Sequence, residues 1–381
     1  MNKAQLRYDI EYLAGHLIHR GASTHSERAA AEYIRDRFQV WTLNSSIDDF
    51  HTHGNTHLLF ACYFGESLVV AFLGHLMPWF GFAYGLVVFA LFFIEHSGYE
   101  LLGRFLPRFD TQNVSARFLS SQPKQTVIVT AHYDSPKTGL LHGEGPGARS
   151  MHALILACMC LVIVSCAAEG LGVFDGWAVQ PDHIVRWAGA LILASLAMRL
   201  IMVDSQNDYQ RGAIDNASGV AAMLGLAQAF TEKPPEKTDV WLVATGSNDA
   251  WMSGMRRLLS TEKLDKANTY FIDIDEVGRG QMAFVERVGV LGRLRPSKKL
   301  VEAARATKPD LKSSSKATAM PSDAYVALAR GYQAMAITTT PDKRTPDAWS
   351  EYDDRPGQID YDTVEQAGDL VEGIIRGFDK A

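Results

Sequence analysis

Residues 212–224 read GAIDNASGVAAML, and this stretch decides the fold. An acidic and an amide side chain, Asp215 and Asn216, stand directly before a run of small and apolar residues. The run 217–230 (ASGVAAMLGLAQAF) predicts a helix, and the polar pair predicts a functional loop at its start. The chain on both sides of this helix shows which sheet the loop belongs to.

Predicted strands and helices alternate around it. Strands are expected at 125–131 (QTVIVTA), 239–245 (DVWLVAT), 270–274 and 333–339. Further helices are expected near 250–259, 322–329 and 363–378, and at the N-terminus, where the second runs from about Thr24 to Phe38 and Ser26 could cap it. The alternation predicts an α/β fold, with a doubly wound, mostly parallel sheet and helices on both faces.

Polar residues follow the ends of these strands, where function sits in such sheets. They are His132 and Asp134 after the first strand, Asp215 before helix 217–230, Asn248 and Asp249 after the second strand, and Asp275 after the third. We expect these side chains to lie at one edge of the sheet.

The same residues stand in motifs that resemble the co-catalytic zinc aminopeptidases, a family related to glutamate carboxypeptidase, glutaminyl cyclase, nicastrin and the transferrin receptor. The resemblance runs through VTAHYDSP, GAIDNASGVAAML, VWLVATGSND and FIDIDEVGRG, and more faintly through the tail DAWSEYDDRPGQIDYDTVEQA. It covers about two-thirds of the chain and implies a zinc-exopeptidase-like fold. In the family two zinc ions polarise the peptide carbonyl and activate a water, while a glutamate moves its proton.

The resemblance assigns a role to each residue of one half of the site. Asp215 would be the carboxylate that bridges two metals. His132 and Asp275 would complete one metal site, and Asp134 would orient the imidazole of His132.

The other half of the site departs from the family. Asn248 occupies the general-base position, and an amide cannot accept a proton at any useful pH. Asp249 stands where the family has a glutamate ligand, so its shorter side chain would be a weak ligand. Ser350 stands in place of a histidine ligand, and no histidine follows His183. We therefore expect zero or one zinc per chain rather than two.

Each of these residues also has a plain structural interpretation. Asp215 could simply be a carboxylate at a helix N-terminus, where the helix dipole favours negative charge. His132 could be a hydrogen-bonded histidine without metal. Asn248 and Asp249 could form an ordinary turn. Of Asp273 and Asp275, which alternate on one strand, one is expected to face solvent.

Two apolar insertions interrupt the α/β domain. Residues 57–104 and 151–203 each predict a membrane hairpin of two helices, because spans of about 20 residues cross a bilayer. Residues 1–56, 105–150 and 204–381 together would form the peptidase-like domain. The alternative is buried helices of a soluble protein. The protein is therefore expected to be an integral membrane protein, of the inner or plasma membrane if the source is bacterial. The loops within the hairpins hold almost no Lys or Arg, which predicts that the peptidase-like domain lies in the cytoplasm.

Composition excludes one class of partner. The net charge is -6, so no broad basic field is available for nucleic acid. The partners expected are the lipid bilayer and other membrane protein subunits, because Gly189, Ala190, Ala194 and Ala197 lie at spacings that suit close helix contact.

The favoured hypothesis is a membrane-embedded pseudo-peptidase that acts as a scaffold or subunit of a complex. The alternative is an active aminopeptidase that cleaves peptides with one zinc and another base, such as Asp249, Glu276 or Glu351. Glutaminyl cyclase activity is disfavoured because the degraded half-site is the one that those enzymes use. A transporter built from four spans has little support, with Glu66 and His75 as the interior ionisable residues.

Overall fold

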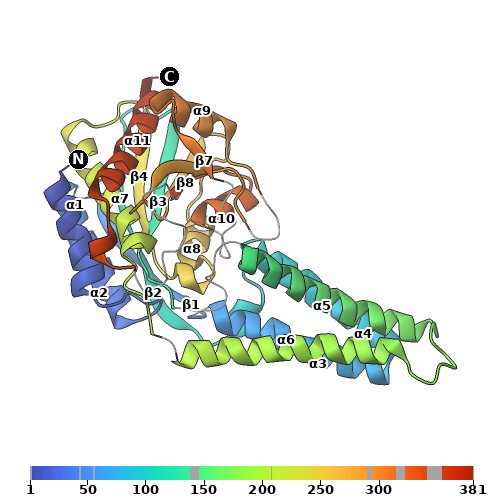
Figure 1. The fold of residues 1–381 in the computed structure, drawn as a ribbon. Coiled ribbons are helices and arrows are strands. Elements are labelled where there is room, and N and C mark those ends of the chain that lie inside the picture. Colours follow the sequence, from blue (N-terminus) through green and yellow to red (C-terminus); the bar gives the residue numbers. More distant parts are fainter. Residues whose placement is uncertain are drawn as a thin grey trace. The chain divides into compact units, whose positions relative to one another are not determined.

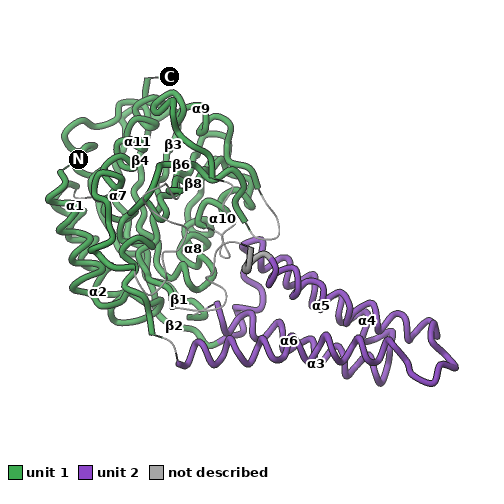
Figure 2. Tube along the Cα trace, viewed as in Figure 1, with its two compact units in different colours: residues 1–54, 107–138, 208–381 green, residues 55–106, 139–207 purple. Residues whose placement is uncertain are grey.

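The chain consists of two compact units (Figure 2). A computed structural model describes residues 2–42, 44–54, 56–137, 146–206, 208–289, 294–314, 322–340 and 354–380. Unit 1 comprises residues 1–54, 107–138 and 208–381, and unit 2 comprises residues 55–106 and 139–207. Unit 1 is an α/β domain, whereas unit 2 is formed by four long helices.

Unit 1 is built on an eight-stranded sheet with the order β1-β2-β4-β3-β5-β8-β6-β7 (Figure 1). The strands are β1 (Ser45–Thr52), β2 (Phe109–Phe118), β3 (Gln125–His132), β4 (Thr238–Thr245), β5 (Thr269–Ile274), β6 (Gln281–Val285), β7 (Lys312–Ser314) and β8 (Gln333–Thr340).

The sheet is mixed, so the predicted parallel arrangement holds at its centre but not throughout. Its centre, β4-β3-β5-β8, is parallel, but β1 pairs with β2, β2 with β4, and β6 with β8 in antiparallel fashion. The segment of unit 2 between β1 and β2 leaves unit 1 and returns to it. Strands on either side of such an excursion can pair as in a hairpin, which is antiparallel.

Helices cover both faces of this sheet. One face carries α1 (Lys3–Ile10), α2 (His25–Trp41), α7 (Ser218–Glu232), α9 (Lys298–Thr307) and α11 (Tyr361–Lys380), which pack on one another and on the strands (Figure 1). The other face carries α8 (Ser253–Thr261) and α10 (Asp323–Ala329). The main apolar core lies between the sheet and the first group.

Two predicted helix starts are corrected. Thr24, not Ser26, caps α2, because the Thr24 side chain accepts a hydrogen bond from the Glu27 backbone N–H. The helix expected from residue 250 begins at Ser253. Trp251 and Met252 have positive φ angles of 58° and 54°, which a right-handed helix cannot include.

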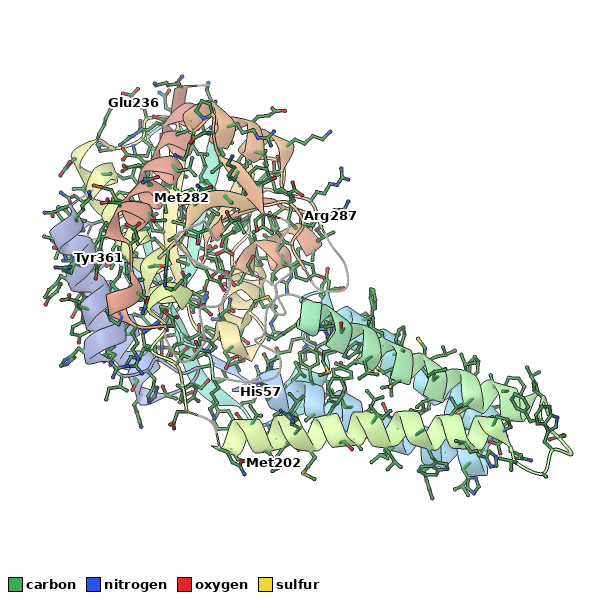
Figure 3. The ribbon with its side chains drawn as sticks, in the orientation of Figure 1. His57, Met202, Glu236, Met282, Arg287 and Tyr361 are labelled. Carbon is green, nitrogen blue, oxygen red and sulfur yellow. The ribbon has the colours of Figure 1, made fainter. Side chains whose placement is uncertain are left out.

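Unit 2 contains α3 (Thr56–Leu76), α4 (Pro78–His96), α5 (Pro146–Gly170) and α6 (Pro181–Gln206). The helices of the second hairpin extend beyond the predicted 151–203 at both ends, whereas those of the first begin one residue before the predicted 57–104 and end inside it. All four are long and apolar enough to cross a membrane. Large apolar side chains such as Phe72 and Met198 are exposed, and Met202 on α6 projects away from the bundle (Figure 3).

Small residues let these four helices approach one another. A Cβ on Gly81 would lie 2.4 Å from the backbone of Gly74, so α3 and α4 nearly touch there. On α6, Gly189 faces Val162 and Cys158 of α5, and Ala190 is fully buried. The small residues expected to face a partner are thus used within the bundle at these two positions.

Candidate functional site

Three predicted residues meet at the carboxyl ends of the central strands. His132 ends β3, Asp275 follows β5, and Asp215 lies in the loop before α7. The Nε2 atom of His132 is 3.0 Å from Asp215 Oδ1 and 3.4 Å from Asp275 Oδ1. Because β3 and β5 are parallel neighbours, their ends bring a histidine and a carboxylate to one point.

The DNASG motif shapes the loop that carries Asp215. The side chain of Asn216 donates to the Ile274 carbonyl at 2.8 Å and accepts from the backbone N–H of Glu276 at 3.1 Å, so it ties the loop to both sides of Asp275. Gly219 allows the helix to start there, since a Cβ on it would lie 2.4 Å from the Ile274 carbonyl oxygen. The Asp215–Asn216 peptide bond is cis.

Two buried residues that sequence reasoning missed hold the Asp215 loop. Asp354 accepts the backbone N–H groups of Ile214 and Asp215 at 2.5 and 3.1 Å. The fully buried guanidinium of Arg20 donates to the carbonyls of Leu13, Tyr133, Arg211 and Gly212. Arg20 therefore connects the N-terminal helices to the residues that flank both His132 and Asp215.

Charge at the cluster favours a cation. Burial lowers the pKa of His132, but Asp134, Asp215 and Asp275 outweigh it and raise that pKa well above its usual value. The carboxylates thus favour a positive charge at the imidazole. The buried Asp275 Oδ1 and His132 Nδ1 atoms have no hydrogen-bond partner within the described part of the chain.

The turn after β4 lies beside this cluster. Asp134 accepts the backbone N–H groups of Asn248 and Asp249, both at 2.9 Å, and its Oδ1 is 3.5 Å from His132 Nδ1. Asp134 therefore faces the imidazole nitrogen as the resemblance implies, although the distance is long for a hydrogen bond. Asp249 is buried but is not part of the described group of potential metal ligands, and Ser350 lies outside the described residues.

The Asn248 side chain acts as a hydrogen-bond donor and not as a base. Its Nδ2 donates to Asp323 Oδ1 at 3.2 Å, and Thr245 donates to Asp323 Oδ2 at 2.6 Å. Burial raises the pKa of Asp323 to about 6. In the sequence Asp323 simply lies at the start of the helix expected at 322–329, and nothing there signals that it contacts Asn248.

A further buried acid, Glu27, also supports this turn. It accepts the backbone N–H of Ser247 at 2.7 Å and the hydroxyls of Ser247 and Thr111. Burial, and then the charge of Asp134, raise the pKa of Glu27 to about 8. The Thr24–Glu27 spacing signals only a helix cap.

Of Asp273 and Asp275, Asp273 is the buried one. It is buried, accepts hydrogen bonds from Thr130 and from the Ala324 backbone, and burial raises its pKa well above the usual value. Asp275, two residues on, keeps 24% of its side chain exposed at the cluster.

The donors of the cluster fit one zinc ion. An imidazole and two carboxylates are common zinc ligands, and tetrahedral bonds of about 2.0–2.1 Å place ligand atoms about 3.3 Å apart. The 3.0 and 3.4 Å separations at His132 agree with that spacing. The described residues of unit 1 offer no second group of three potential ligands.

The resemblance to the zinc aminopeptidases is supported by a match to a known family. Residues 200–375 match the sequence model of Peptidase family M28. The similarity to the co-catalytic zinc aminopeptidases of that family is thereby confirmed. The matched M28 segment includes Asp215, Asn248, Asp249, Asp275 and Ser350, whereas His132 and Asp134 precede it. A search of curated proteins finds no match.

Solved structures share the fold with the M28-like chain at low identity. A zinc aminopeptidase from Bacillus subtilis has a TM-score of 0.58 at 13% identity, covering 99% of this chain and 95% of its own. A Zn-dependent exopeptidase from Parabacteroides distasonis scores 0.53 at 14% identity, with 98% and 97% covered. A glutaminyl cyclase from Bacteroides thetaiotaomicron scores 0.53 at 13% identity, with 98% and 96% covered. These likenesses establish a zinc-exopeptidase-like fold.

Proposed function

We propose that this chain is a membrane-embedded pseudo-peptidase. Its M28-like domain holds at most one zinc, does not hydrolyse peptides, and serves as a subunit of a membrane complex. The four apolar helices of unit 2 support the membrane assignment.

One observation carries the loss of catalysis. Asn248 stands in the general-base position, and its amide donates to a buried carboxylate instead of accepting a proton from water. Loss of a positioned base costs about 10²–10⁴ in rate. The substituted ligand positions Asp249 and Ser350 lower the capacity for a second metal as well.

The retained residues would still hold a single ion. His132, Asp215 and Asp275 would bind it, and Asp134, Asn216 and Asp354 would orient the imidazole and the Asp215 loop. A bound zinc supplies a Lewis acid and an acidified water. Without a base to accept the proton of that water, these residues serve binding rather than turnover.

A second candidate is an active one-zinc aminopeptidase, and Asp323 is the observation in its favour. Its carboxyl contacts Asn248 and has a pKa of about 6, which burial raises into the range of a general base. Asp323 is only 1% exposed, so this candidate function requires water to reach a buried carboxyl group.

Activity measurements separate the two candidates. Purified wild type in detergent is assayed with aminoacyl p-nitroanilides and dipeptides, beside His132→Ala. We expect wild type and His132→Ala to release equal amounts of product from these substrates. The combined replacement Asn248→Glu, Asp249→Glu and Ser350→His restores the family pattern and controls for the choice of substrate.

Wild-type release above the His132→Ala background would overturn the pseudo-peptidase proposal. If that release is lost in Asp323→Asn, Asp323 is the base and the second candidate holds. The subunit role is tested separately in mild detergent, where a chain that is monomeric and alone would contradict it.

A further inference from the structure

A second group of potential metal ligands lies in unit 2, far in sequence from the peptidase-like motifs. It consists of His75 in the last turn of α3, Glu169 in the last turn of α5 and His183 in the first turn of α6. One ligand atom from each lies within 4.8 Å of the others. Two imidazoles and one carboxylate form a frequent zinc donor set.

The distances within this group fit a shared metal ion. His183 Nε2 is 3.0 Å from Glu169 Oε1, and this buried nitrogen has no other partner in the described part of the chain. Ligand atoms around a tetrahedral zinc lie about 3.3 Å apart. The imidazole of His75 meets that of His183 edge to face, with 5.6 Å between ring centroids.

Arg186 provides the surroundings that a metal ligand needs. Its fully buried guanidinium bonds Oε2 of Glu169 and leaves Oε1 directed at His183. Outer contacts of this kind fix the orientation of a ligand. The positive guanidinium also neutralises the charge of Glu169, which lowers the free-energy cost of burying that carboxylate.

We infer that His75, Glu169 and His183 form a binding site for a divalent transition metal, with zinc as the fitting ion. His75 comes from the first helical hairpin and the other two ligands from the second. The ion would therefore fasten the two hairpins at one end of the bundle. This site is separate from the cluster at His132 and does not depend on the proposed function.

Metal content per chain tests the site. The full-length protein is purified in detergent, stripped with a chelator, and incubated with zinc or cobalt. His132→Ala serves as the background, because it removes the imidazole of the other candidate site. We expect this variant to retain one zinc per chain, and the addition of His75→Ala to lower zinc affinity at least tenfold.

The side chain of His75 is exposed, so its replacement preserves folding better than a change at buried Arg186. His152→Ala in the same background is the matched control, since His152 lies on α5 about 26 Å from Glu169 along an ideal helix. It should leave binding unchanged. Zinc should also raise the melting temperature of His132→Ala but not of His75→Ala/His132→Ala.

Cobalt gives a direct signature, because tetrahedral Co²⁺ ligated by nitrogen and oxygen absorbs visible light more strongly than the hydrated ion. The site is refuted if His132→Ala binds no zinc, or if removing His75 and His183 changes neither the stoichiometry nor the cobalt spectrum. In that case Glu169, His183 and Arg186 form only an ion-pair network.

Discussion

At the scale of single residues, Arg20 connects segments that are distant in sequence. Its four bonds to backbone carbonyls range from 2.6 to 2.7 Å, and the residue is fully buried. Arg20→Ala would remove all four bonds, although the Gly212 carbonyl would still accept the Ala217 backbone N–H. A buried carbonyl that is left without a partner costs about 1–3 kcal/mol. We expect a loss of at least about 3 kcal/mol in the stability of unit 1, measured by denaturant unfolding with tryptophan fluorescence.

Arg20→Lys is the informative companion variant. It keeps the positive charge but cannot reach four carbonyls, so its stability should fall between those of wild type and Arg20→Ala. Equal stability of Arg20→Lys and wild type would mean that charge, rather than the hydrogen bonds, accounts for the effect.

The raised pKa of His132 predicts how zinc binding responds to pH. A proton occupies the imidazole among three carboxylates, and zinc must displace it. Zinc affinity in the His75→Ala/His183→Ala background should therefore rise with pH, tenfold per unit, until the pKa of His132 is passed. Calorimetry in buffers of different ionisation enthalpy should show about one proton released per zinc. A flat pH profile would exclude His132 as the ligand.

At the scale of elements, two glycines of unit 2 make a matched pair. An alanine Cβ at Gly81 would lie 2.4 Å from the backbone of Gly74, whereas a Cβ at Gly65 meets nothing within 4 Å. Alanine improves helix propensity by about 1 kcal/mol at either position. Gly81→Ala should nevertheless lower the melting temperature in detergent, because α3 and α4 must separate, while Gly65→Ala should keep or raise it. The same change in both variants would contradict this packing.

The chain as a whole should behave as an integral membrane protein. Four apolar helices with exposed side chains such as Phe72 and Met198 would be poorly soluble in water. After extraction of membranes with alkaline carbonate, the protein should remain in the pellet and dissolve only in detergent. Release by carbonate would show that the helices do not insert.

The charge of the segments around the helices predicts an orientation in the membrane. The loop between α5 and α6 carries Asp175 and no Lys or Arg, whereas Arg199 and Arg211 lie at or beyond the other end of α6. We expect alkaline phosphatase fused within this loop to be active, since that enzyme folds outside the cytoplasm, and a fusion after α11 to be inactive. The reverse pattern would place the peptidase-like domain outside.

Sequence alone determined those features of the protein that depend on local pattern. The parallel centre of the sheet follows from alternating apolar runs, and the four helices of unit 2 follow from unbroken apolarity. His132, Asp215 and Asp275 could be grouped from their positions in the chain, because parallel strands end at a common edge. Strand β1 (SSIDDFHT) escaped prediction, since its polar residues carry little apolar pattern.

Only the tertiary structure decided which distant side chains share a space. Asp323, Asp354, Glu27 and Arg20 are ordinary charged residues in the sequence, and each acquires a role through burial and a partner more than 70 positions away. The group of His75, Glu169 and His183 likewise arises because three helix ends meet. Short periodic patterns specify elements, whereas hydrogen bonds and ion binding depend on distances of a few ångströms between elements, which no local pattern encodes.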